Sequence, residues 1–208
     1  PEDVVTWGQE GLTVAQHSFR SWEAAAEYFK ASPFAITQFT FPQVVRWGRW
    51  GRALAADSPV ISSAFFRATP GVLSHIDAEA FFTWASMGKT LYNGTWKSSS
   101  LCSTYYDASP DLLGTLTVAE LQMLVGLVDV LSQKSFDAAN DCLLASAEIF
   151  SRVDRVDRAN FLSLGTALTR ENWRDLKAYF EHTPRILLHL EPTQRARFLQ
   201  LGERISKN

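Results

Sequence analysis

The stretch from Trp47 to Leu54, WGRWGRAL, decides the fold of this chain. Its residues Trp47, Gly51 and Leu54 place an aromatic, a glycine and a leucine at positions i, i+4 and i+7, which form one face of an α-helix. The same pattern recurs as Trp84, Gly88 and Leu91, as Phe161, Gly165 and Leu168, and as Phe198, Gly202 and Ile205. This recurrence predicts a chain of tandem helical repeats.

A recurring Ser/Thr-Pro pair sets the register of the repeats. The positions that share it are Pro33, Pro70, Pro110 and Pro184, and Ala147 after Ser146 fills the missing place. The spacings between these positions are 37, 40, 37 and 37 residues. Fourteen residues after each of them lies the first position of the next pattern, occupied by Trp47, Trp84, Leu124, Phe161 and Phe198. A fixed period of this length is typical of stacked helical repeats.

Within each repeat, the register aligns a small residue on the first helix and an aromatic pair on the second. The small column contains Gly11, Gly51, Gly88, Val128, Gly165 and Gly202. We expect it to admit a close helix approach, because a mid-helix Gly otherwise costs about 1 kcal/mol relative to Ala. The pairs are Tyr28-Phe29, Phe65-Phe66, Tyr105-Tyr106 and Tyr179-Phe180, and Cys142-Leu143 takes their place in one degenerate repeat. The Ser/Thr-Pro that follows each pair predicts the start of a short third helix.

We therefore predict an all-α protein, an α-solenoid of about five repeats of 37–40 residues, of the armadillo or HEAT kind. A single helical-repeat domain is expected over residues 1–208. The chain starts at Pro1 and both ends fall inside a first helix, so we expect it to be a piece of a longer protein. Predicted N-caps of the long helices are Thr40, Asp77, Thr117 and Asp154.

Composition restricts the classes of function. A net charge of -2 argues against a protein built mainly to bind nucleic acid. No apolar run of membrane-spanning length and no signal-peptide pattern is present in the sequence, which predicts no membrane partner. The two cysteines, Cys102 and Cys142, form no disulfide framework, and we interpret them as buried small hydrophobes in a cytoplasmic protein.

The sequence contains only weak signals for catalysis or metal binding. Ser86 and Lys89 match the Ser-x-x-Lys pattern of some serine hydrolases, but they align with Arg49 and Arg52 of the preceding repeat, which favours a helix surface. The histidines, none at metal-ligand spacing, are His17, His75, His182 and His189. We interpret Trp22, Trp96 and Trp173 as repeat packing rather than as an aromatic cage. The expectation is a protein that is not an enzyme and binds no cofactor or metal.

The candidate binding residues are the exposed positions of the first helices. Arg46, Arg49 and Arg52 lie three apart and form a basic stripe. The equivalent positions of later repeats are polar and differ from one another: Thr83, Ser86, Lys89, Asn160, Ser163, Thr166, Arg197 and Gln200. Variable exposed positions suit recognition by a protein-interaction scaffold, the leading hypothesis, although an ordinary solvated helix face is the alternative. The rival function is a nucleic-acid-binding solenoid that uses the arginine stripe.

One known family has a similar pattern. The motif Trp47-x3-Gly51-x2-Leu54, followed by Phe65-Phe66-Arg67-Ala68-Thr69-Pro70-x2-Leu73, resembles helical repeats of certain bacterial proteins. Those repeats lie N-terminal to a von Willebrand factor A domain in proteins of the nitric-oxide-reductase-activation and Rubisco-activase-adaptor kind. The resemblance covers nearly the whole chain and implies an adaptor that recognises a client enzyme for a MoxR-type ATPase. Because the Asp-x-Ser-x-Ser motif of those A domains is absent from this sequence, no ATPase-coupling residue is carried over.

Overall fold

Helices account for nearly all of the described chain. The computed structural model describes residues 2–16 and 21–206. In chain order the elements are α1 (Glu2–Ala15), α2 (Ser21–Gln38), α3 (Phe41–Asp57), α4 (Pro59–Leu73), α5 (Ala78–Thr90), α6 (Trp96–Leu113), α7 (Val118–Ser132), α8 (Phe136–Ser151), the 3-10 turn η1 (Arg155–Asp157), α9 (Arg158–Asn172), the 3-10 turn η2 (Trp173–Asp175), α10 (Leu176–Leu188) and α11 (Pro192–Ser206). These ranges contain no β-strand, so the predicted all-α class is confirmed.

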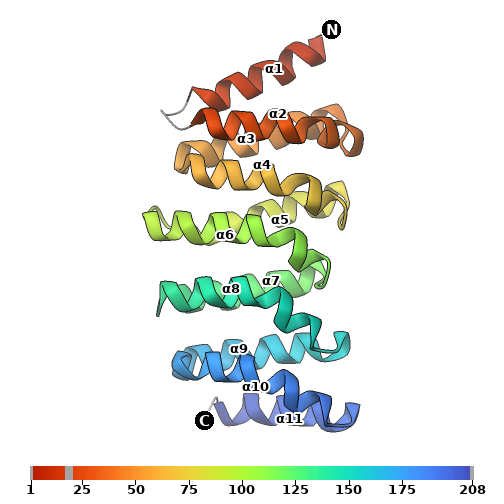
Figure 1. Ribbon diagram of the computed structural model, residues 1–208, viewed down its shortest axis with the longest axis vertical. Coiled ribbons are helices and arrows are strands. Elements are labelled where there is room, and N and C mark those ends of the chain that lie inside the picture. Colours follow the sequence, from red (N-terminus) through yellow and green to blue (C-terminus); the bar gives the residue numbers. More distant parts are fainter. Residues whose placement is uncertain (1, 17–20, 207–208) are drawn as a thin grey trace. The chain divides into compact units, whose positions relative to one another are not determined.

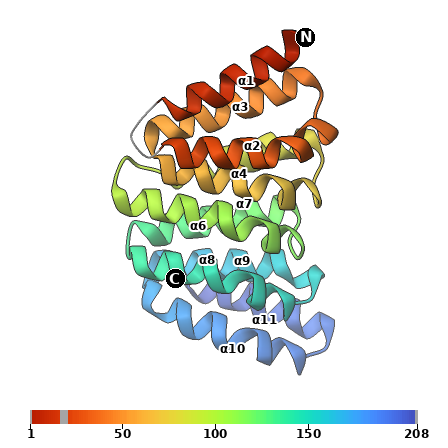
Figure 2. The same ribbon diagram turned by 45° about the horizontal axis from the view of Figure 1, so that its top comes forward.

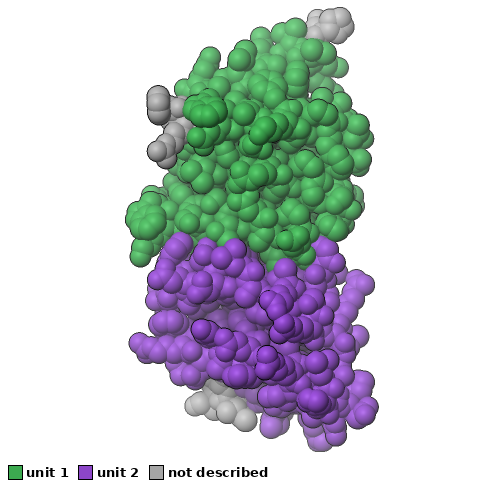
Figure 3. Space-filling view, viewed as in Figure 1, with its two compact units in different colours: residues 1–113 green, residues 114–208 purple. Residues whose placement is uncertain are grey.

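The helices group into two compact units, residues 1–113 and 114–208 (Figure 3). In unit 1, which holds α1 to α6, the helices α2, α4 and α6 lie side by side and α1 packs against α3 (Figures 1 and 2). In unit 2, which holds α7 to α11, the helices α7, α9 and α11 lie side by side, and α8 contacts α10 less extensively. A single domain over the whole chain stays a prediction.

In unit 1 the second ring of each aromatic pair lies on the glycine of the preceding helix. A Cβ added to Gly51 of α3 would lie 1.9 Å from Cζ of Phe66 on α4. The small column is therefore a seat for a side-chain ring, which is why the two helices approach closely. Val128 of α7 and Leu143 of α8 occupy the same two columns in unit 2, and both are fully buried. Val128, which is larger than the glycine of other repeats, is thus accompanied by Leu143, which is smaller than their aromatic ring. Further rings sit on glycine at Gly11 under Phe29 and at Gly88 under Tyr106.

The first ring of each pair joins neighbouring helix pairs in unit 1. Tyr28 stacks on both Trp7 and Trp47, with ring centroids 6.3 and 4.8 Å apart. Phe65 stacks in the same way on Trp84 at 5.6 Å. The hydroxyl of Tyr28 also donates a hydrogen bond of 3.0 Å to the carbonyl oxygen of Trp7. The same bond joins Tyr105 to Trp84 in unit 1 and Tyr179 to Phe161 in unit 2.

The prolines lie inside the second helices, so the predicted third helices do not exist as separate elements. In α4 the helix continues through Pro70, whose nitrogen cannot donate the usual backbone hydrogen bond. The hydroxyl of Thr69 donates to the carbonyl oxygen of Phe65 at 3.0 Å and accepts from Nε1 of Trp47 at 3.0 Å. Such a hydroxyl-to-carbonyl bond bends a helix, as does proline, and a bend is visible at the right-hand end of α6 (Figure 1). Equivalent bonds are made by Ser32, Ser109 and Ser146.

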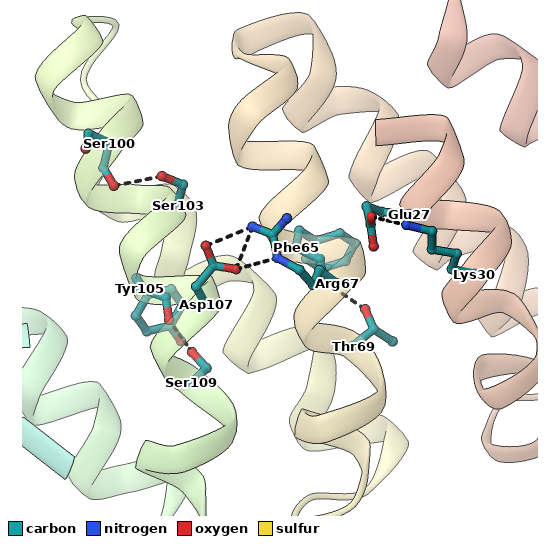
Figure 4. Close-up of polar contacts among 10 residues, drawn as sticks. All are labelled: Glu27, Lys30, Phe65, Arg67, Thr69, Ser100, Ser103, Tyr105, Asp107 and Ser109. Atoms are coloured by element: carbon teal, nitrogen blue, oxygen red, sulfur yellow. Dashed lines mark hydrogen bonds and ion pairs between the residues drawn. The ribbon is translucent and has the colours of Figure 1, made fainter. Parts of the chain in front are cut away.

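An ion pair connects α4 and α6 on the solvent side of unit 1. Nε and Nη2 of Arg67 donate to Oδ1 of Asp107 at 3.0 and 2.8 Å, and Nη2 also reaches Oδ2 at 2.9 Å (Figure 4). Both side chains are about half exposed, so the pair contributes at most about 1 kcal/mol. The buried hydroxyls of Thr69 and Ser109 lie one helical turn below their carbonyl partners in the same view. Packing, rather than charge, therefore holds these helices together.

The predicted caps form at Thr40, Asp77 and Thr117. At Thr117 the backbone N–H donates to Oε2 of Glu120 at 2.7 Å, and the backbone N–H of Glu120 donates to the Thr117 hydroxyl at 3.3 Å. The prediction for Asp154 is wrong, because its carboxylate forms no cap hydrogen bond. That carboxylate is instead paired with the guanidinium of Arg195 on α11.

Candidate binding surfaces

The arginine stripe of α3 is engaged by neighbouring helices. Nε of Arg49 lies 3.5 Å from Oε1 of Glu10 on α1, and Nη1 of Arg52 lies 3.4 Å from Oε2 of the same carboxylate. Glu10 is buried, although the equivalent position of later repeats is apolar. The guanidinium of Arg46 lies 4.0 Å from the centre of the Phe82 ring on α5. All three guanidinium groups of the stripe thus have a partner within unit 1, although two of them share one carboxylate.

The next set of predicted residues lies exposed along α5. The hydroxyl of Ser86 donates to the carbonyl oxygen of Thr83 at 2.8 Å. Nζ of Lys89 lies 3.1 Å from Oδ2 of Asp57 at the end of α3. The serine proton is thus held by the backbone and the ammonium by a carboxylate. This arrangement belongs to a helix surface rather than to a serine nucleophile activated by a lysine.

In unit 2 two of the predicted residues line a hollow between α7 and α9. Asn160, Ser163 and Thr166 lie half-buried along α9. Ser163 and Thr166 face a space of about 590 Å³. The other residues that line it are Met123, Gly126, Ala167, Arg170 and Glu171. Met123 is partly exposed, and a Cβ added to Gly126 would meet no atom within 4 Å. A bare glycine in mid-helix therefore contributes to the hollow.

The last predicted pair, Arg197 and Gln200, is exposed on α11 and does not line this hollow. The same helix exposes 40% of Phe198 and 55% of Leu201, although Phe161, in the same column as Phe198, is fully buried. Within unit 2, the predicted residues are thus divided between two places. Arg170 and Glu171, which complete the hollow, were missed because the repeat register assigned them no special position.

A second groove, which the sequence did not predict, lies between α8 and α10. It has a volume of about 390 Å³ and is mainly apolar. Cys142 and Ile149 line it from α8, Leu131 from α7, and Leu176 and Phe180 from α10. Charged side chains border it, namely Asp141 on α8, Arg174 on η2, and Lys177 and Glu181 on α10.

The sequence does contain a signal for this groove. Cys142 stands in the column that elsewhere holds Tyr28, Phe65, Tyr105 and Tyr179. At Tyr28 and Phe65 a large ring fills the space beside the neighbouring helix pair. A thiol is much smaller than a ring, so the space beside α10 is left open. The break in the aromatic pair had been interpreted only as degeneracy of that repeat.

Neither cysteine is an activated nucleophile. Both are buried, as predicted, and burial raises the pKa of each thiol to about 12. The thiol of Cys102 also donates a hydrogen bond of 3.0 Å to the carbonyl oxygen of Gly88. Because the thiolate is the reactive form, both residues stay protonated and unreactive at neutral pH.

Other candidate chemistry is sparse in the described part of the chain. Residues 2–16 and 21–206 contain no group of three or more His, Cys, Asp or Glu side chains placed to hold a metal ion, and His17 lies outside them. Among the described helices, none combines the length and the apolar character that crossing a bilayer requires. Trp22 and Trp96 are 61% and 75% exposed, so their interpretation as packing residues is wrong. Trp173 is half-buried and lines the α8–α10 groove.

No protein-family model matches this chain, and neither a curated protein nor a solved structure does. The resemblance to the adaptor repeats therefore stays a hypothesis. The function has to be inferred from the geometry of the two concave surfaces.

Proposed function

We propose that this protein is an α-solenoid of the armadillo or HEAT kind that acts as a non-enzymatic scaffold and binds a segment of a partner protein. The recurring contacts support the solenoid. In the three helix pairs of unit 1 a ring sits on a glycine, and the tyrosine hydroxyls of α2, α6 and α10 bond to a carbonyl of the preceding helix. Contacts of this kind let each repeat pack mainly on its neighbours, and they leave the outer positions free to vary.

The observation that carries the binding function is the α7–α9 hollow. Ser163 offers a hydroxyl, Arg170 offers N–H donors and Glu171 offers carboxylate acceptors on one concave surface. The hydroxyl of Thr166 donates to the carbonyl oxygen of Leu162 and can still accept a hydrogen bond there. A peptide backbone presents both N–H and C=O groups, so a mixed set of donors and acceptors suits it. Met123 adds a flexible apolar side chain that adapts to different partners. A segment of a partner protein is thus a better match than a single small anion or cation.

Nucleic acid is the weaker alternative. A nucleic-acid-binding solenoid would use Arg46, Arg49 and Arg52 against phosphates. Arg49 and Arg52 already share the carboxylate of Glu10, and Arg46 lies on the Phe82 ring. Titration with DNA and RNA at low salt should show no binding. A strong affinity that falls steeply with salt would favour this alternative, since neutralised phosphates release counterions.

Gly126 offers a direct test of the hollow. Because a Cβ there meets open space, Gly126→Phe fills the hollow without disturbing the core, and Gly126→Ala serves as the matched control. Peptides selected from a random 12-residue display library on the whole chain should bind the Ala variant as well as the wild type. They should lose about tenfold in affinity on Gly126→Phe and on Arg170→Ala, a loss of about 1.4 kcal/mol in binding free energy. Selected peptides that bind the Phe variant undiminished would rule the hollow out.

The resemblance to the adaptor repeats adds one element to this proposal. It makes the partner a client enzyme of a MoxR-type ATPase, with the bound segment exposed on the client's surface. A client with such a segment should compete with the selected peptides for the wild-type chain. It should not bind Gly126→Phe.

A further inference from the structure

We infer that the groove between α8 and α10 is a second docking site, which takes an amphipathic α-helix of a partner protein through an aromatic or leucine side chain. The α7–α9 hollow shares only α7 with the groove and none of its lining residues, so we expect the two sites to have independent occupants. A helix in the groove would therefore remain bound if the hollow were blocked.

The groove lacks the aromatic ring that other repeats carry at the position equivalent to Cys142. In unit 1 the equivalent ring of Tyr28 or Phe65 fills the gap to the next helix pair, at centroid distances of 4.8 Å from Trp47 and 5.6 Å from Trp84. At position 142 the floor of the groove is instead formed by the thiol, by Leu131 and by Phe180. A ring or leucine side chain brought by a partner would bury apolar surface there, at about 25 cal/mol per Å² removed from water.

The shape of the groove suits a helix. The residues of α8 that line it with apolar side chains or a thiol are Ala138, Cys142, Ala145 and Ile149, which share one helical face. They extend over 12 residues, from 138 to 149, a rise of about 16 Å at 1.5 Å per residue, which is about three helical turns. Ala138 and Ala145 are small, so the backbone of an incoming helix can approach closely.

Opposite charges border the groove on its two sides. On α8, Asp141 lines it, and Asp137 is exposed one turn earlier on the same stripe. On the other side Arg174 and Lys177 are exposed, although Lys177 also lies 3.9 Å from the carboxylate of Glu181. A helix with basic residues on the flank that faces α8 and acidic residues on the other is complementary to this arrangement, which favours one orientation over the reverse. Apolar anchors at i, i+4 and i+7 between such flanks are the usual form of a groove-binding helix.

Filling the groove tests this assignment. Helices selected on the whole chain from a display library of amphipathic sequences, with randomised anchors and flanks, should bind Cys142→Ala as they bind the wild type, because the space is kept and only the thiol is lost. They should bind Cys142→Tyr about tenfold more weakly, because the ring takes their place. Ala145→Phe should weaken them equally. Since Ala145 is exposed, this second variant obstructs the groove even if the first disturbs the core.

The charges give an independent readout. Arg174→Glu combined with Lys177→Glu should weaken the binding of the selected helices. A helix in which the acidic residues of the flank facing these two positions are replaced by basic residues should bind the double variant with the original affinity. Gly126→Phe should leave helix binding unchanged, whereas a loss there would place the helix in the α7–α9 hollow. Selection that yields no helix sensitive to both Cys142→Tyr and Ala145→Phe overturns the assignment. Two other results would also overturn it. One is mass spectrometry of the purified chain that finds a bound small apolar molecule displaced by Ala145→Phe, in which case the occupant is a small ligand. The other is sedimentation that finds a dimer abolished by Ala145→Phe, in which case the occupant is a second copy of the chain.

Discussion

Replacing Gly51 by alanine tests whether glycine is needed there to make room for the Phe66 ring of the following helix. The added Cβ would lie 1.9 Å from Cζ of Phe66 and 2.5 Å from each neighbouring ring carbon, against 3.4–4 Å for an ordinary contact. The ring cannot move aside easily, because it packs edge-on against Tyr28 at 5.2 Å and Trp47 at 5.0 Å between centroids. All three of these rings are fully buried. The methyl group therefore forces a shift of the packed core.

The size of the effect follows from two opposing terms. Alanine is preferred to glycine in mid-helix by about 1 kcal/mol. Overpacking a buried site costs about 1–3 kcal/mol, and the short Cβ distances at Gly51 place it at the upper end of that range. We expect Gly51→Ala to lower the free energy of unfolding by about 2 kcal/mol. Gly126→Ala, where the Cβ meets open space, should raise it by up to about 1 kcal/mol.

Urea denaturation followed by circular dichroism measures both values, and a double-mutant cycle adds a sharper test. Gly51→Val combined with Phe66→Leu copies the pair found at Val128 and Leu143. The double variant should be more stable than the sum of the two single effects predicts, by about 1 kcal/mol or more. The requirement for glycine under the ring is refuted if Gly51→Ala is as stable as Gly126→Ala. It is also refuted if the effects of Gly51→Val and Phe66→Leu on the free energy of unfolding are simply additive.

Three further predictions follow from the hydrogen bonds, the ion pair and the thiols. Thr69→Val leaves the buried N–H of Trp47 without its acceptor and should cost about 1–3 kcal/mol of unfolding free energy, whereas Thr69→Ser should restore most of it. Asp107→Asn breaks the exposed pair with Arg67 and should cost at most about 1 kcal/mol, a loss that shrinks in 1 M salt. Burial raises the pKa of Cys142 from 9.0 to about 12, so the folded chain keeps a proton that the unfolded chain loses in this interval. Stability should therefore fall as pH rises above about 9, by up to about 1.4 kcal/mol per pH unit for this thiol, and Cys142→Ala should reduce the slope measured by urea denaturation between pH 8 and 10.5.

The helical class and the register of the columns were predictable, because a packing pattern that repeats at one period shows itself in a single sequence. The role of proline was not. Ser/Thr-Pro is a good helix start in isolation. At Thr69 and Pro70, however, the hydroxyl bonds back to the carbonyl of Phe65, and the helix continues as a bent segment. Tertiary contact with Trp47 overrides the local preference here, and no window of sequence contains that contact.

The candidate surfaces were predictable only in part. Exposed polar positions such as Thr83 could be found from periodicity alone. Their neighbours could not, because the carboxylate that faces Arg49 and Arg52 comes from Glu10, some 40 residues earlier, at a position that other repeats fill with apolar residues. The α8–α10 groove depends on what is missing at Cys142. Repeats that depart from their own consensus are therefore the places where such a sequence is most informative about function.

The hydroxyl bonds of the aromatic pairs also bear on how the chain folds. Tyr28 and Tyr105 each bond to a carbonyl 21 residues earlier in the chain, and Tyr179 to one 18 residues earlier. Loops this short close at little entropic cost. Each helical hairpin can thus find its native pairing before the hairpin next to it has formed, which favours rapid folding. A whole hairpin could accordingly be duplicated or deleted in evolution while the remaining hairpins keep their internal bonds.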